Sequence, residues 1–263
     1  MMNTKTQLLN NSRFYILVVS VLLSVIVISY VRLYIPSDQL FYIRSQQLFG
    51  LLAMVYWFVA LSISPVAYVL KKPFILRLAF ARRAIGVSAA YFALLHGIIA
   101  LWGQLGGLSQ LKLLPSLFQW SIAGGAIGLL ILLVMAATSF DRVVVAMTYK
   151  KWKLLHRLVY GGFIVVCLHI WTIGTHLAYS GVQWIAFIAL VVLCGLEIYR
   201  IISRINDKHR YFDTTEKITL FVSVWVVIVA LIACTPLVIN NYHSQHTDHE
   251  TSTQHSETEV HDD

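Results

Sequence analysis

The sequence predicts an all-α fold of the polytopic membrane class, a bundle of helices that each cross a lipid bilayer. Of its 263 residues, 58% are hydrophobic and only 12% are charged, which is too apolar for a soluble chain of this length. Seven runs of mostly apolar residues have the length of about 20 residues that spans a bilayer core. Because lipid offers no partners for free backbone groups, each run is expected to be a helix. The runs cover Phe14–Ile35, Ser45–Leu70, Ala84–Gly103, Phe118–Ala137, Leu154–Thr175, Val182–Ile202 and Ile218–Ile239.

The basic residues alternate between the two sides of these predicted spans. A net charge of +8 would by itself suit nucleic-acid binding. However, 17 of the 20 Lys and Arg residues fall at the N-terminus or in the loops after the second, fourth and sixth runs. The other side holds three, Arg32, Arg44 and Lys112. The positive-inside rule then predicts a multi-pass protein of the inner (plasma) membrane, with a cytoplasmic N-terminus and an extracytoplasmic C-terminus. Membrane lipid is the expected partner, and nucleic acid is not.

Four segments follow from this pattern. Residues 1–13 form a cytoplasmic N-terminus, residues 14–205 a transmembrane core of six helices, residues 206–239 a linker and a seventh helix, and residues 240–263 an extracytoplasmic tail. The tail holds five histidines and no Lys or Arg. Its low hydrophobicity predicts disorder, and loose capture of a divalent metal by its His, Asp and Glu residues is the alternative.

Four histidines lie within or at the edge of the predicted spans, where ionisable side chains are costly and usually functional. At about 1.5 Å per residue, His96 and His169 lie about 20 and 24 Å from the cytoplasmic ends of their helices, and His156 only about 5 Å. His96 and His169 could therefore ligate one iron from opposite sides, as in a bis-imidazole haem. His156 would suit an inner redox site or an inner haem face. His176, at the outer mouth, is either an exposed loop residue or an exit-side contact.

One point of geometry stays open in the fifth span. Thirteen residues at about 100° each place His156 and His169 on different faces of an ideal helix. Either the helix winds tightly near Gly161–Gly162, or the two histidines address a haem from different angles. The same glycines, and Gly97 beside His96, would admit a flat macrocycle or, equally, allow close helix packing.

Several strings around these histidines resemble one family. They are SISPVAYVLKKPFILRLAFARRAIG, YFALLHG around His96, KKWKLLHRLVY around His156 and LHIW around His169. With their spacings of 60 and then 13 residues, they are similar to the ferric-reductase-like transmembrane domain superfamily. Within it, the chain looks most like the haem-binding membrane subunits of periplasmic methionine sulfoxide reductase systems, over about residues 14–205.

This resemblance implies a six-helix core that binds b-type haem (haem b) through His96, His156 and His169. It implies electrons arriving from a cytosolic flavin reductase or from quinol, and leaving to an extracytoplasmic redox protein, a molybdopterin enzyme that repairs oxidised methionine. It leaves flavin mononucleotide (FMN) open as a second cofactor, although the chain has no flavin motif. Larger relatives carry a second histidine near the position of Arg82, so the inner histidine pair is incomplete here. Arg82 and Arg83 could instead neutralise haem propionates, or be ordinary positive-inside charges.

The leading hypothesis is therefore an oxidoreductase subunit for electron transport, with its donor elsewhere because no GxGxxG or Walker motif encodes a nucleotide-binding module. A ferric or cupric reductase would share the haem core and use the His-rich tail to gather metal ions. A non-redox membrane transporter, or an assembly factor, whose histidines bind substrate or metal is the third possibility.

Overall fold

The computed structural model describes residues 4–70, 73–174 and 180–206. Within these ranges all regular structure is helical, and six helices are long and apolar enough to cross a membrane. The prediction of an all-α polytopic membrane protein is confirmed. The predicted seventh span (Ile218–Ile239), His176 and the tail (240–263) lie outside the described residues.

Five long helices and several short ones make up residues 1–186, which form one compact unit. The long helices begin and end within a few residues of the predicted runs, except that α1, α2 and α3 start 10, 7 and 11 residues earlier. The elements in chain order are α1 (Thr4–Tyr34), α2 (Asp38–Leu70), α3 (Pro73–Ile98), the π-helix η1 (Ile99–Gln104), the 3₁₀ helix η2 (Leu108–Leu113), α4 (Ser116–Ala137), α5 (Asp141–Met147), α6 (Tyr149–Leu155) and α7 (Leu158–Ile173). The remaining helix, α8 (Ser180–Asn206), runs into the second unit, residues 187–263.

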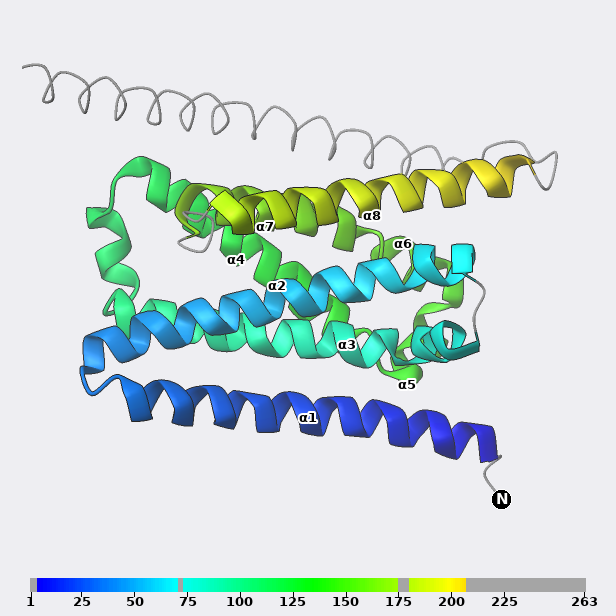
Figure 1. The fold of residues 1–263 in the computed structure, drawn as a ribbon, viewed down its shortest axis with the longest axis horizontal. Helices are drawn as coiled ribbons and strands as arrows, with labels where there is room; N and C mark the ends of the chain where they lie inside the picture. The colour runs from blue at the N-terminus through cyan, green and yellow to red at the C-terminus, as the bar shows by residue number, and fades with distance from the viewer. Residues whose placement is uncertain (1–3, 71–72, 175–179, 207–263) are drawn as a thin grey trace, which may run out of the picture. The chain divides into compact units, whose positions relative to one another are not determined.

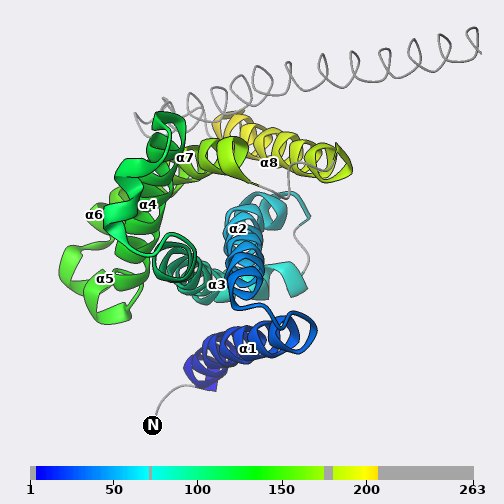
Figure 2. The same ribbon diagram turned by 90° about the vertical axis from the view of Figure 1, so that its left-hand side faces the viewer.

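Within the first unit, α1, α2, α3, α4 and α7 run side by side (Figures 1 and 2). The most extensive packing is between α2 and α3 and between α4 and α7, and α3 also packs against α1 and α4. Helix α3 therefore joins the two pairs. The short helices α5 and α6 lie at the end of the bundle where α1 begins, which we call the α5 end. We call the opposite end, where α1 finishes and η2 lies, the η2 end.

Aromatic and small side chains fill the space between α2 and α3. The rings of Phe49 and Phe92 stack with centroids 6.2 Å apart, and both side chains are fully buried. Two hydroxyl contacts tie α1 to α3, because Ser20 donates to Ser88 over 2.8 Å and Ser24 lies 2.8 Å from the hydroxyl of Tyr91. In an apolar medium such hydrogen bonds and close packing replace the hydrophobic effect as the source of helix association.

The predicted fifth span is not one continuous helix. The regular α-helix is interrupted by a turn at His156 and Arg157, between α6 and α7, although both residues keep right-handed helical dihedral angles. The amide of Arg157 bonds the carbonyl of Leu154, three residues back, and the amide of Tyr160 bonds that of Arg157. These shorter i→i−3 bonds tighten the turn. The interruption lies at His156 and Arg157, just before Gly161–Gly162, so His156 and His169 do not lie on one ideal helix.

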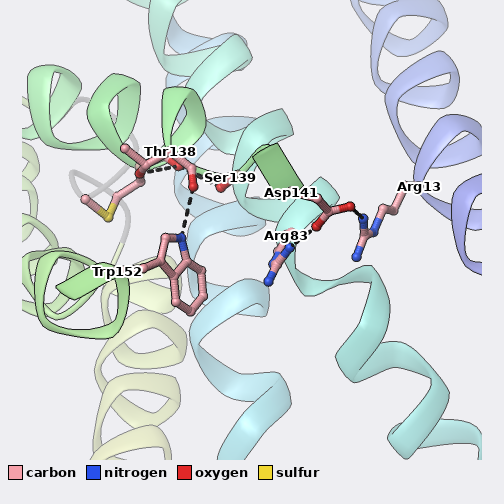
Figure 3. Close-up of polar contacts among 7 residues, drawn as sticks. Arg13, Arg83, Thr138, Ser139, Asp141 and Trp152 are labelled. Carbon is pink, nitrogen blue, oxygen red and sulfur yellow. Dashed lines mark hydrogen bonds and ion pairs between the residues drawn. The ribbon is translucent and has the colours of Figure 1, made fainter. Parts of the chain in front are cut away.

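Ion pairs mark both ends of the first unit. At the α5 end, Asp141 accepts from Arg13 of α1 at 3.1 Å and from Arg83 of α3 at 2.6 Å (Figure 3). At the η2 end, Arg32 pairs with Asp38 at 2.7 Å. Asp38 and Asp141 are the only acidic residues in the first 186. The carboxylates of this unit thus stand at its ends, and its middle is left to histidines and hydroxyl groups.

Candidate functional site

The structure brings His96 of α3 and His169 of α7 together. Their ring centroids are 6.3 Å apart and the ring planes cross at 81°. The two histidines lie 73 positions apart in the sequence. They meet because α4 packs against both α3 and α7. The predicted approach of these two histidines is therefore found in the fold.

Each of the two rings donates a hydrogen bond to the backbone of a neighbouring helix. The Nδ1 atom of His96 lies 2.8 Å from the carbonyl oxygen of Gln46 on α2, and Nδ1 of His169 lies 2.8 Å from that of Ser121 on α4. A carbonyl oxygen only accepts, so in both neutral rings the proton is on Nδ1. The lone pair is then on Nε2, the arrangement that prepares a histidine to bind a metal.

The separation of the two rings matches what one shared metal ion would require. A histidine nitrogen bound to a metal lies about 2.0 Å from it, and a ring nitrogen lies about 1.2 Å from the centre of its imidazole. Two imidazoles on opposite sides of one ion would therefore have centroids about 6.4 Å apart, against the observed 6.3 Å. Among the described residues no cluster of three or more His, Cys, Asp or Glu side chains could hold a metal ion. His96 and His169 are a pair of facing imidazole rings.

His156 is held differently, at the α5 end. It ends α6, its Nδ1 lies 3.2 Å from the carbonyl oxygen of Trp152 one turn back, and its ring lies against the Trp152 ring with centroids 4.0 Å apart. Trp152 in turn donates from Nε1 to the carbonyl oxygen of Thr138 over 2.9 Å (Figure 3). The structure thus anchors His156 through its own helix and through α4, apart from the contact between His96 and His169.

The two arginines predicted near a cofactor make contacts within the protein. Arg82 donates to the carbonyl oxygen of Ala60 over 2.7 Å and to Ser64 over 2.8 Å, both on α2. Arg83 bonds Asp141, and its guanidinium carbon lies 5.0 Å from the ring centroid of Trp152. A guanidinium group has five N–H donors, of which these contacts use only some. A role for either residue toward haem propionates stays a prediction.

Sequence reasoning missed the residues that surround the two rings. Gly50 and Gly125 face the rings of His96 and His169, and the Ser121 hydroxyl donates to the carbonyl oxygen of His169 over 3.2 Å. Helical periodicity could not have found them, because it does not tell which helices are neighbours. Trp57 was also missed. It is 2% exposed, and its indole N–H has no hydrogen-bond partner among the described residues.

The glycines that were singled out serve helix packing. A Cβ atom at Gly162 would lie 3.1 Å from Ile131 and 3.3 Å from Trp57, and one at Gly97 would lie 3.3 Å from Leu129. A Cβ atom at Gly161 would meet nothing within 4 Å. Of the two explanations left open by the sequence, close packing fits Gly97 and Gly162.

Comparison with known proteins shows the family of this chain. The family model described as ferric reductase like transmembrane component matches residues 46–167, which include His96 and His156. The chain is 30% identical over 155 residues to the protein-methionine-sulfoxide reductase heme-binding subunit MsrQ of Cronobacter sakazakii, covering 53% of this chain and 75% of that protein. The chain belongs to the ferric-reductase-like transmembrane family.

Further proteins named as MsrQ heme-binding subunits are similar to the chain over shorter stretches. The MsrQ protein of Deinococcus radiodurans is 33% identical over 127 residues, which cover 46% of this chain and 56% of the relative. That of Polaromonas naphthalenivorans is 29% identical over 103 residues, covering 39% and 45%. The chain thus spans about half the length of these two relatives. No solved structure matches it.

The packing around His156 predicts how its reactivity changes. Replacing Trp152 with leucine removes the stacked ring and the hydrogen bond to Thr138, so His156 should become more accessible. We expect several-fold faster modification of His156 by diethyl pyrocarbonate in the detergent-solubilised Trp152→Leu variant, followed by mass spectrometry of the peptide. Trp120→Leu is the matched control, since Trp120 is 78% exposed. Equal modification rates in the two variants would contradict the described packing.

Proposed function

We propose that this chain is a b-type haem membrane subunit that carries electrons through the bilayer. The observation that carries the proposal is the axial pair of His96 and His169, with centroids 6.3 Å apart and Nδ1 of each bonded to a backbone carbonyl. The matched relatives are named heme-binding subunits, which supports haem as the group held between these rings.

The residues around the pair fit such a group. Two neutral imidazoles are a common axial ligand set for haem iron in electron-transfer proteins. Gly50 on α2 and Gly125 on α4 let the two rings lie directly against the backbones of these helices.

Haem, when bound, would supply the one-electron chemistry, and the protein would supply ligands, orientation and an apolar setting. His96 and His169 would hold the iron, and their Nδ1 hydrogen bonds would fix the orientation of each ring. The surrounding apolar helices would keep water from the ring pair. His156, thirteen residues before His169 and next to the basic α5 end, would serve an inner redox site.

The direction of transfer follows from the charge pattern. With the α5 end in the cytoplasm of a cell with an inner membrane, as the basic loops favour, electrons would enter near His156 and leave beyond His96 and His169. The donor would be a cytosolic flavin reductase or quinol. The acceptor would be the catalytic subunit of a methionine sulfoxide reductase, because the matched relatives carry the name of that system.

Replacing either axial histidine should remove the haem signal. For His96→Ala and His169→Ala we expect loss of the reduced-minus-oxidised b-type spectrum of the purified protein, because one imidazole cannot replace the pair. His156→Ala should retain the signal of the axial pair, and a tail variant such as His246→Ala should leave the spectrum unchanged. Full b-type spectra in both axial variants would refute the assignment of this pair.

The crossing angle of the rings predicts a spectroscopic signature. When two imidazole planes are nearly perpendicular, each ring interacts with a different iron d orbital of π symmetry. The two orbitals then stay close in energy. We therefore expect the oxidised protein to give a strongly anisotropic low-spin ferric signal in low-temperature electron paramagnetic resonance. A rhombic signal of the kind given by parallel imidazole planes would contradict the angle of 81°.

Electron passage across a bilayer tests the function itself. Liposomes that contain the haem-loaded protein and enclose ferricyanide should reduce it when dithionite is added outside, and liposomes with His96→Ala should react at the rate of protein-free ones. Dithionite can then be replaced by a flavin reductase with NADH, or by a reduced quinol, to identify the donor class. Equal rates with wild-type protein and with protein-free liposomes would rule out an electron conduit.

A further inference from the structure

We infer that Gly50 and Gly125 are positioning residues for the two axial histidines, an inference that rests on the proposed haem function. Each glycine lies on a helix next to its histidine, and each lies four residues after the carbonyl that accepts the Nδ1 proton. Gly50 follows Gln46 on α2, and Gly125 follows Ser121 on α4. The same arrangement therefore occurs twice, once for each ring.

The four-residue spacing has a physical reason. In an α-helix each Cα–Cβ bond tilts toward the N-terminus, so the side chain of residue i+4 lies over the carbonyl of residue i. That carbonyl already accepts the helix hydrogen bond, and only its second lone pair can accept another. A glycine at i+4 uncovers this lone pair. The histidine ring can then approach from the neighbouring helix and donate to it.

The space at both glycines is already filled by the rings. A Cβ atom at Gly50 would lie 2.9 Å from Nδ1 and 3.1 Å from Cε1 of His96. One at Gly125 would lie 2.8 Å from Cε1 and 2.9 Å from Nδ1 of His169. These distances are well inside ordinary van der Waals contact. An added methyl group would therefore displace the ring and stretch its hydrogen bond to the carbonyl.

Other glycines of the unit meet different neighbours. A Cβ atom at Gly128 would meet Val166, and one at Gly103 would meet Tyr42. Among the glycines that the structure describes, Gly50 and Gly125 are the two whose added Cβ would meet a histidine ring. General close packing of helices would not select these two positions. The positions of Gly50 and Gly125 are therefore explained by the histidine rings that they face and by the carbonyl groups that these rings bond.

The hydrogen bonds that the glycines permit also affect the electronic properties of the ligands. A histidine that donates Nδ1–H to a carbonyl is a more basic ligand through Nε2. A more basic ligand favours the ferric form, because that form carries the higher positive charge. Gly50 and Gly125 would thus hold the midpoint potential of the bound haem lower than it would be with the hydrogen bonds stretched.

Two pairs of alanine variants test this inference. Gly50→Ala and Gly125→Ala should raise the midpoint potential in redox titrations of the purified, haem-loaded protein, and should lower haem affinity by about 10–100-fold. Gly86→Ala on α3 and Gly161→Ala on α7 are matched controls, because a Cβ atom at either would meet nothing within 4 Å. Both controls should keep the wild-type potential, haem content and thermal unfolding temperature.

The outcomes separate this inference from the proposed function. Haem in the wild type, with the same potential and affinity in all four variants, would overturn the positioning role alone. Unfolding of both Gly50→Ala and Gly125→Ala would also overturn it, since a displaced ring in an intact bundle is what we expect. Absence of haem from the wild type after haem-replete expression would overturn the proposed function and this inference with it.

Discussion

The need to satisfy a polar group inside an apolar helix bundle governs this structure. A neutral imidazole at membrane depth carries one N–H that must find an acceptor. Leaving such a buried donor unpaired costs on the order of a few kcal/mol. The carbonyls of the surrounding helices are already bonded within their own helices. Only their second lone pairs remain, and these are reachable where the covering side chain is absent. Gly50 and Gly125 meet this condition, and the geometry of the pair follows from it.

The same constraint explains where the charges lie. The two carboxylates of the first 186 residues stand at opposite ends of the unit, each beside arginine. Asp141 joins the start of α1 to α3, and the exposed position of its side chain keeps this contribution modest. The middle of the unit is thereby left with neutral polar groups. A redox centre placed there would change its charge without a carboxylate beside it.

How much the sequence could predict differs between the fold and the site. Apolar runs were enough to predict the six spans that the structure describes, because bilayer thickness and the pairing of backbone groups act on each segment separately. The level of His96 and His169 followed from helical rise alone. The break at His156 did not, because it depends on local i→i−3 bonding that hydropathy does not record. Gly50, Gly125 and Ser121 were missed because their importance depends on which helix is the neighbour.

The three histidines are held in place in two different ways. His96 and His169 are fixed by bonds to other helices, so their mutual distance depends on the packing of α2 against α3 and of α4 against α7. His156 bonds a carbonyl of its own helix and rests on Trp152, which Arg83 and Thr138 hold. The spacing of His96 and His169 is thus set by hydrogen bonds between helices, whereas the position of His156 is set by a bond within its own helix and by the contacts of Trp152 with Thr138 and Arg83.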